Sequence, residues 1–238
     1  MIEMEYVRGG QLKRLYKERS SHLTEAECAK VMKSLLEGVL YIHSLDIIHR
    51  DLKPENILLE TSSENCFDVK IVDFGLSAVF HIDRSKNDYY KAGTVSYMSP
   101  EQAIKQSYSK KIDIWACGIV MYQLLSRGKH PWYCKGEYKT DQAINKLNAI
   151  ERGEVTWEFS DSWSPMARDF FQKMCSYPQS VRYNAEQALQ HPWITRDFSQ
   201  TIPKAFNQQI DLIDKEHRLR FAIKSIFFQS VLIQTQKQ

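Results

Sequence analysis

The stretch His49-Arg50-Asp51-Leu52-Lys53-Pro54-Glu55-Asn56 decides how this chain of 238 residues is interpreted. Two shorter blocks follow it in order, Asp73-Phe74-Gly75 and Ser99-Pro100-Glu101. A tripeptide such as Asp-Phe-Gly recurs by chance and is weak evidence alone. An octapeptide with both partners at sensible spacing is specific, and it predicts one functional unit rather than three unrelated surface turns on an α-rich domain.

The three blocks resemble the catalytic loop, the magnesium-binding motif and the end of the activation segment of protein kinases. The resemblance extends from about residue 1 to residue 194. It implies a mainly α (α+β) fold, a protein-kinase-like C-terminal lobe with a few short strands. We therefore expect residues 1–195 to form the hinge and C-terminal lobe of a kinase domain, and residues 196–238 to form a helical regulatory or junction-like tail.

In an enzyme of this kind, phosphoryl transfer depends on positioning and on charge neutralisation. The resemblance implies that Asp51 is the base that orients the substrate hydroxyl, and that Lys53 offsets charge on the transferring γ-phosphoryl. Asn56 and Asp73 offer the hard oxygen ligands that Mg²⁺ prefers. Gly75 gives the backbone freedom just after the metal ligand. The implied cofactors are ATP and Mg²⁺.

The segment Met4-Glu5-Tyr6-Val7-Arg8-Gly9-Gly10-Gln11-Leu12 is similar to the hinge between kinase lobes. The resemblance assigns adenine binding to the Glu5 carbonyl and the Val7 amide, with Met4 as gatekeeper and Leu58 as the floor beneath the adenine. The family's Gly-rich loop, strand lysine and helix-C glutamate all precede the hinge. We therefore expect a large lobe without its small lobe, which keeps the catalytic loop but phosphorylates negligibly by itself.

Three further residues have supporting roles by the same resemblance. Asp113, in the run Asp113-Ile114-Trp115-Ala116-Cys117-Gly118, is expected to brace the backbone of the catalytic loop. Glu101 and Arg182 are expected to form the buried ion pair that holds the activation segment.

Arg50 corresponds to an arginine that often binds a phosphate on the activation loop. The usual phosphosite falls on Tyr90, which is neither Ser nor Thr, so activation by a phosphothreonine at that point is not expected. The alternative acceptors are Ser77, Ser85 and Ser96.

Several details narrow the class of substrate. Lys53 after Asp51-Leu52, together with Gly93-Thr94, is similar to serine/threonine kinases. Glu55 matches a position that pairs with a substrate arginine in kinases that prefer basic protein sequences, although Gln11 departs from the acidic residue common there. The run from residue 180 to residue 194 resembles the calcium/calmodulin-dependent group, especially calcium-dependent protein kinases.

Composition is typical of a globular protein, with 43% hydrophobic and 26% charged residues. The net charge of +3, without a polybasic block, does not indicate a nucleic-acid partner. The five cysteines have no spacing typical of a zinc site. The first residues lack an apolar signal-peptide core, and the apolar stretch from Phe221 to Ile233 is too short and too interrupted to span a membrane. We expect a cytoplasmic, intracellular protein.

Hydrophobic periodicity predicts many helices and a few short strands. A capping box of Thr24 and Glu27 predicts a helix with Val31, Leu35, Val39 and Ile42 on one face. The other predicted helices are Gln11–Arg19, Ile112–Leu125 (apolar nearly all round), Asp141–Arg152, Pro165–Cys175 and Asn184–Gln190, and the predicted strands are Ile47–Ile48, Ile57–Leu59 and Val69–Val72.

The segment from Ile210 to Ile233 mixes apolar and basic residues in the pattern of a basic amphipathic helix. Such a helix suits a calmodulin target, an autoinhibitory segment, or a junction helix before an EF-hand module; a helix that merely covers the lobe is the alternative. The chain itself has no EF-hand loop. For the whole chain, the alternatives to an active kinase are a non-catalytic pseudokinase scaffold and a module that presents its tail to calmodulin.

Overall fold

The computed structural model describes residues 5–19, 22–63, 65–79, 93–104, 107–132, 140–153 and 157–198. The expectations for Met4, Ser85, Tyr90 and the segment Ile210–Ile233 therefore lie outside the described residues. The helices are α1 (Arg14–Lys17), α2 (Glu25–Ser44), α3 (Pro100–Ala103), α4 (Lys111–Leu125), α5 (Thr140–Glu151), α6 (Pro165–Met174), α7 (Ala185–Leu189) and α8 (Pro192–Thr195). The strands are β1 (Ile47–Ile48), β2 (Ile57–Leu59), β3 (Val69–Ile71) and β4 (Ala78–Val79), and the 3₁₀ turns are η1 (Phe74–Leu76) and η2 (Val95–Tyr97).

Helix α2 begins at the predicted capping box. The backbone N–H of Glu27 donates to the Thr24 hydroxyl at 3.2 Å, and the backbone N–H of Thr24 donates to the Glu27 carboxylate at 2.8 Å. These bonds satisfy donors that the first turn of a helix leaves without partners. The predicted apolar face is also confirmed, because Val31, Leu35, Val39 and Ile42 are all buried.

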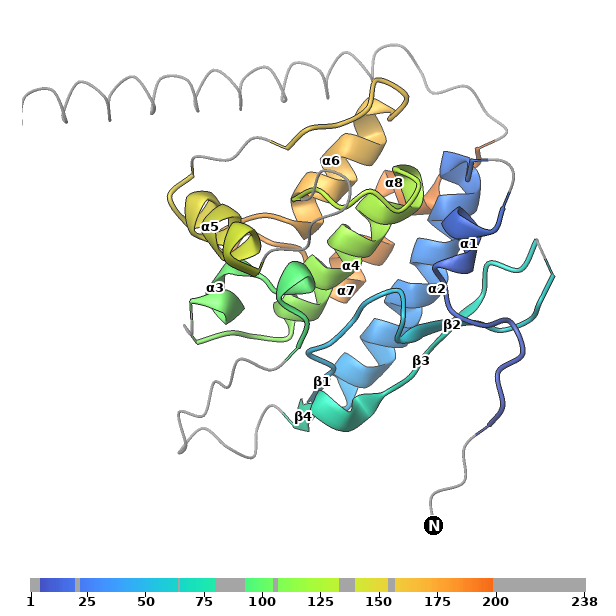
Figure 1. Ribbon diagram of the computed structural model, residues 1–238, viewed down its shortest axis with the longest axis horizontal. Helices are drawn as coiled ribbons and strands as arrows, with labels where there is room; N and C mark the ends of the chain where they lie inside the picture. The colour runs from blue at the N-terminus through green and yellow to red at the C-terminus, as the bar shows by residue number, and fades with distance from the viewer. Residues whose placement is uncertain are drawn as a thin grey trace, which may run out of the picture.

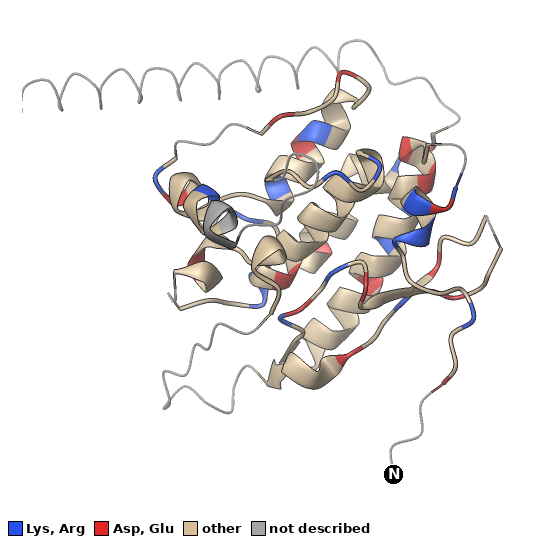
Figure 2. Cartoon of the chain, viewed as in Figure 1, with Lys and Arg blue, Asp and Glu red and all other residues tan. Residues whose placement is uncertain are grey.

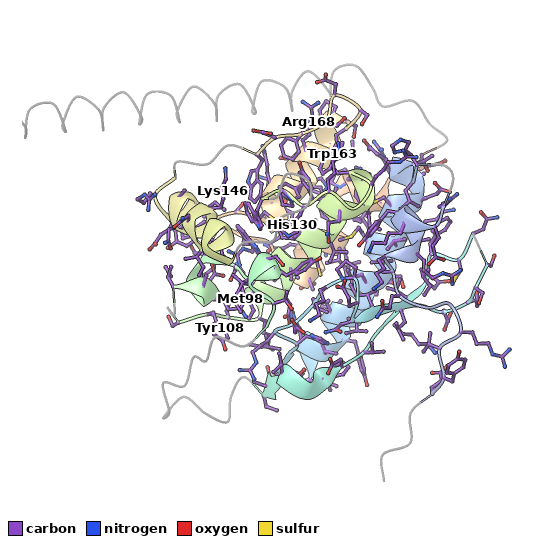
Figure 3. All side chains as sticks on the ribbon, viewed as in Figure 1. Met98, Tyr108, His130, Lys146, Trp163 and Arg168 are labelled. Atoms are coloured by element: carbon purple, nitrogen blue, oxygen red, sulfur yellow. The ribbon has the colours of Figure 1, made fainter. Side chains whose placement is uncertain are left out.

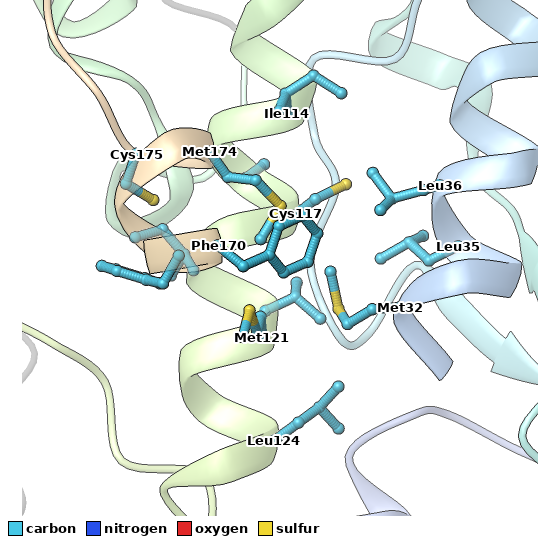
Figure 4. Close-up of a cluster of buried hydrophobic side chains, with 14 of the residues drawn as sticks. Met32, Leu35, Leu36, Ile114, Cys117, Met121, Leu124, Phe170, Met174 and Cys175 are labelled. Carbon is cyan, nitrogen blue, oxygen red and sulfur yellow. The ribbon is translucent and has the colours of Figure 1, made fainter. Parts of the chain in front are cut away.

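Helix α4 is the centre of the molecule (Figure 1). Twelve of its residues are buried, on every side of the helix, as its continuous apolar character predicted. Figure 2 shows this helix almost free of charged residues, whereas the elements around it carry both signs. Figure 4 shows why: α4 presents Cys117 and Met121 to a layer formed by Leu35 of α2 and Phe170 of α6.

The strands form two separate antiparallel pairs, β1 with β4 and β2 with β3. The predicted strands are confirmed within one residue, while β4, α3 and α8 were not predicted. The predicted helix over Gln11–Arg19 is wrong at its start. Gln11 forms a bridge with Leu58, and the N–H of Leu12 donates to the Ile57 carbonyl at 2.8 Å. The chain is thus extended there, and α1 covers only Arg14–Lys17.

Among the described residues, no helix combines the length and apolar character needed to cross a bilayer.

The cap of α2 makes a first prediction. Replacing Thr24 by Ala removes the hydroxyl acceptor and should lower the free energy of unfolding by about 1 kcal/mol, measured by urea denaturation. Thr24→Ser keeps the hydroxyl and serves as the control, with an expected change of a few tenths at most. Equal unfolding midpoints for Thr24→Ala and Thr24→Ser would show that the hydroxyl contributes nothing.

Candidate active site

The buried carboxylate of Asp113 holds the backbone of the His49–Asn56 loop. Asp113 is only 1% exposed and accepts the backbone N–H groups of His49 at 2.9 Å and Arg50 at 3.0 Å. The Nε2 atom of His43, on the last turn of α2, lies 2.9 Å from the same carboxylate. A buried carboxylate is costly unless its lone pairs are hydrogen-bonded, so these contacts fix the loop against α4.

Several backbone positions in this region have positive φ angles, among them Arg50, Asp73 and Gly93. Arg50 adopts φ 69°, which is uncommon for a residue other than glycine, and the Asp113 bonds to its own and the preceding amide hold it there. Gly93 adopts φ 111°, and a Cβ at this position would lie 2.3 Å from the Arg50 carbonyl. Only glycine therefore allows the segment that follows it to approach the loop.

Thr94 follows Gly93 and meets the carboxylate of Asp51. Its backbone N–H and its hydroxyl donate to Asp51 Oδ1 at 2.9 and 2.8 Å. On the other oxygen, Oδ2, Asp51 accepts from Lys53 Nζ at 2.7 Å and from Asn56 Nδ2 at 3.0 Å. Burial acts to raise the pKa of Asp51, but the bonds from Lys53 and Thr94 outweigh it and hold this pKa below its usual value. Asp51 is therefore ionised at neutral pH.

Lys53 donates hydrogen bonds to both Asp51 and Thr94. Its ammonium lies 2.7 Å from Asp51 Oδ2 and 2.8 Å from the Thr94 hydroxyl. Since the side chain is only 22% exposed, its charge acts in a partly desolvated setting beside the carboxylate.

Asn56 and Asp73 lie at the same end of the β2–β3 ribbon. Ile57 pairs with Ile71, and the N–H of Val72 donates to the Asn56 carbonyl at 2.9 Å, which brings the residues flanking both strands together. The Asn56 amide nitrogen donates to the Asp51 carbonyl and carboxylate, so its amide oxygen is the atom available to a cation.

These two residues fit Mg²⁺ by the chemistry of their donors, an amide oxygen and an exposed carboxylate. One oxygen of Asp73 accepts the Gly75 N–H at 3.3 Å. Within the described ranges, no group of three or more His, Cys, Asp or Glu residues could hold a metal ion alone. A cation at Asn56 and Asp73 would therefore need further ligands from phosphate or water.

Glu101 and Arg182 meet in a buried, two-pronged ion pair. The Arg182 nitrogens lie 2.6 and 3.0 Å from the two Glu101 oxygens, and both residues are at most 1% exposed. Arg182 also donates to the Lys111 and Ser176 carbonyls, and its guanidinium lies 4.9 Å from the ring of Trp115. The buried charge thus has four hydrogen bonds and an aromatic ring beside it, which offset the cost of burial.

The guanidinium of Arg50 contacts main-chain carbonyls beyond the Asp73-Phe74-Gly75 block. It donates to the Leu76 carbonyl and, at 3.4 Å, to the Ser77 carbonyl and the Tyr108 hydroxyl. In this structure Arg50 therefore holds the start of the segment after η1.

The remaining predicted residues line the outer parts of the region. Glu5 is exposed and its carboxylate lies 2.7 Å from Lys70, while Val7 and Leu58 are half-buried. Glu55 is exposed on the loop, and its charge adds to the effect of burial in raising the pKa of Tyr16.

From the sequence, Thr94 was used only to indicate a serine/threonine kinase, and no role was predicted for His43. No local pattern reveals the His43 contact, because it joins residues 70 positions apart.

Comparison with known proteins identifies the family that has this arrangement. Residues 1–194 match the family model described as protein kinase domain. The chain belongs to the protein kinase family. It is 39% identical over 172 residues to calcium-dependent protein kinase 4 of Plasmodium berghei (strain Anka) and to the protein of the same name from Plasmodium falciparum (isolate 3D7). Each match covers 71% of this chain and 31% of the relative, so the kinase chain described here spans about a third of the relatives' length.

The ion pair of this kinase makes a second prediction. Arg182→Lys keeps the charge but loses the two-pronged geometry and the stacking on Trp115, and should lower the free energy of unfolding by about 3 kcal/mol. Arg14→Lys is the control, because the Arg14–Glu18 pair is exposed and four residues apart on the chain. Its loss should be below about 0.5 kcal/mol. Equal losses in urea denaturation would contradict a special role for the buried pair.

Proposed function

We propose that this chain is the catalytic large lobe of a serine/threonine protein kinase, which transfers the γ-phosphoryl of ATP to a protein hydroxyl. The observation that carries the proposal is the cluster around Asp51: an ionised carboxylate with a lysine ammonium at 2.7 Å and an alcohol hydroxyl at 2.8 Å. Phosphoryl transfer requires an acceptor for a hydroxyl proton next to a cation that offsets phosphate charge. Asp51 and Lys53 supply these two groups side by side.

Asp51 would orient the acceptor hydroxyl and accept its proton. The contact from the Thr94 hydroxyl to Asp51 Oδ1 supports this role, because it shows that the carboxylate receives an alcohol O–H in good geometry. A serine or threonine side chain has the same donor. The low pKa of Asp51 keeps it in the ionised form that such a contact needs.

Lys53 would stabilise the transferring γ-phosphoryl, since its partly desolvated ammonium adjoins the base. Asn56 and Asp73 would hold Mg²⁺, which when bound neutralises phosphate charge. The Glu5 carbonyl, the Val7 amide and Leu58 would receive the adenine. Asp113 and the Glu101–Arg182 pair would keep the loop and the activation segment in place.

The substrate is proposed to be a protein with basic residues near the acceptor. Glu55 supports this proposal, because it presents an exposed carboxylate from the loop that carries Asp51. An exposed acid near the reacting hydroxyl favours a cationic side chain on the incoming peptide.

We also propose the domain division of residues 1–195 as kinase hinge and large lobe and 196–238 as a regulatory tail that binds calmodulin or joins an EF-hand module. Its support is the basic amphipathic pattern of the tail and the relatives' name, calcium-dependent protein kinase 4.

Replacing the base tests the proposed chemistry. The assay uses a longer protein in which a kinase small lobe precedes residue 1. Asp51→Asn should lower kcat by about a thousandfold or more with nearly unchanged ATP affinity, because Asp51 acts on the acceptor hydroxyl. Asp73→Asn should weaken Mg-ATP binding as well as turnover, because it removes a metal ligand.

Asp68→Asn is the matched control, since Asp68 is an exposed carboxylate in the connection between β2 and β3. Its kinetics should equal those of the unchanged protein. Retention of most activity by Asp51→Asn would sink the assignment of the base, whereas absence of activity in the unchanged longer protein would favour a scaffold without catalysis.

A synthetic peptide of residues 210–233 tests the tail. If it is a calmodulin target, it should bind calcium-loaded calmodulin in a fluorescence titration. The expected apolar anchors are Phe221 and either Phe227 or Phe228. Replacing these aromatic residues by Ala should weaken binding by about tenfold or more, whereas Arg220→Ala should cost about twofold, because buried aromatic anchors dominate such interfaces. Absence of binding would leave the junction helix or a surface cover as the remaining accounts.

A further inference from the structure

The main-chain carbonyl of Ser96 accepts a hydrogen bond from the buried side chain of Trp132, 36 positions further along the chain. Ser96 is 3% exposed and lies in η2, and its carbonyl accepts the indole N–H of Trp132 at 3.0 Å. Trp132 is itself 7% exposed and follows α4 in the chain. A buried carbonyl needs a donor, so this bond ties the middle of η2 to the core.

The neighbours of Trp132 fix the direction of its N–H. Its ring stacks on Trp115 of α4 with centroids 6.4 Å apart and tilts against Trp157 at 5.0 Å and His130 at 5.9 Å. Burial lowers the pKa of His130 to about 3 and outweighs a hydrogen bond with the Ser96 backbone that acts to raise it, so this neighbour is neutral at physiological pH. Figure 3 shows His130 within the body of the lobe, between α4 and α5. A ring enclosed in this way cannot turn to another acceptor without disturbing the cluster.

The same short segment reaches the reacting groups. Thr94 is the N-cap of η2, and the N–H of Tyr97 donates to the Thr94 carbonyl at 2.9 Å. Thr94 in turn donates twice to Asp51, so the position of η2 sets the position of the Thr94 hydroxyl. A hydroxyl hydrogen-bonded to Asp51 Oδ1 would therefore lie beside Thr94, at the start of η2.

We propose that Trp132 is a positioning residue for the protein substrate: by holding the Ser96 carbonyl it fixes η2, and with it the surface that receives the chain beside the acceptor hydroxyl. The substrate part of this inference rests on the proposed kinase function. The positioning part rests on the Trp132–Ser96 bond and on the ring contacts of Trp132, and it does not depend on that function.

Amide hydrogen exchange of the 238-residue chain tests the positioning part. Trp132→Phe keeps a buried ring but removes the N–H, and should speed exchange of the Tyr97 and Met98 amides about fivefold or more, because the 3₁₀ turn opens more often. The amides of Val31 and Leu35 in α2 report global stability and should change less. Trp163→Phe is the matched control, because within the described part of the chain the indole N–H of this buried residue has no hydrogen-bond partner.

If Trp132→Phe proves too unstable, replacement by 3-benzothienylalanine keeps the bicyclic shape and removes only the N–H. Equal exchange at Tyr97 and Met98 in the Trp132 and Trp163 variants would overturn the inference. Equal increases in the exchange rates of the Tyr97 and Val31 amides would also overturn it, because they would show that Trp132 contributes only to global stability.

Kinetics in the longer protein test the substrate part. Trp132→Phe should raise the KM for a peptide substrate about fivefold and leave the KM for ATP unchanged, since Asn56 and Asp73 lie on another segment. An unchanged peptide KM would overturn this part. If the unchanged longer protein has no kinase activity, the proposed function fails instead, and the exchange measurement alone then decides whether Trp132 holds η2.

Discussion

The bond between Asp113 and the two amides of His49 and Arg50 is the interaction on which the site depends. A carboxylate at 1% exposure must have its oxygens satisfied, and here the loop backbone and His43 satisfy them. The requirement acts in both directions: α4 keeps its buried charge only with the loop in place, and the loop keeps its left-handed residue only with α4 in place. The position of Asp51 follows from this mutual dependence.

Helix α4 also supports the stretch of chain from Gly93 to Glu101, through a second residue. Trp115, two positions after Asp113, has Arg182 over one part of its ring system and Trp132 stacked beside it. Arg182 pairs with Glu101, and Trp132 holds Ser96, which precedes Glu101 in the same stretch of chain. Helix α4 thus fixes both the His49–Asn56 loop and the Gly93–Glu101 stretch. Because it is covered on all sides, it has few charged or solvent-exposed residues.

Sequence patterns predicted the elements that local rules govern. The capping box of α2 and the continuous apolar run of α4 were found because each depends on residues a few positions apart. The start of α1 was predicted wrongly because Gln11 forms a β-bridge with Leu58, which is 47 positions further along the chain. The contacts of Thr94, His43 and Trp132 were missed for the same reason, since each joins distant segments through a single side chain. The Asp51 loop was found only because its residue types are so specific together.

The four donors around Asp51 have a thermodynamic consequence for recognition. Because the carboxylate is already saturated, an arriving hydroxyl exchanges one hydrogen bond for another and gains little free energy by doing so. An alcohol that hydrogen-bonds to Asp51 would therefore contribute little affinity. For the proposed kinase function this means that affinity for a peptide would come from its flanking sequence, whereas the acceptor oxygen would matter for the reaction.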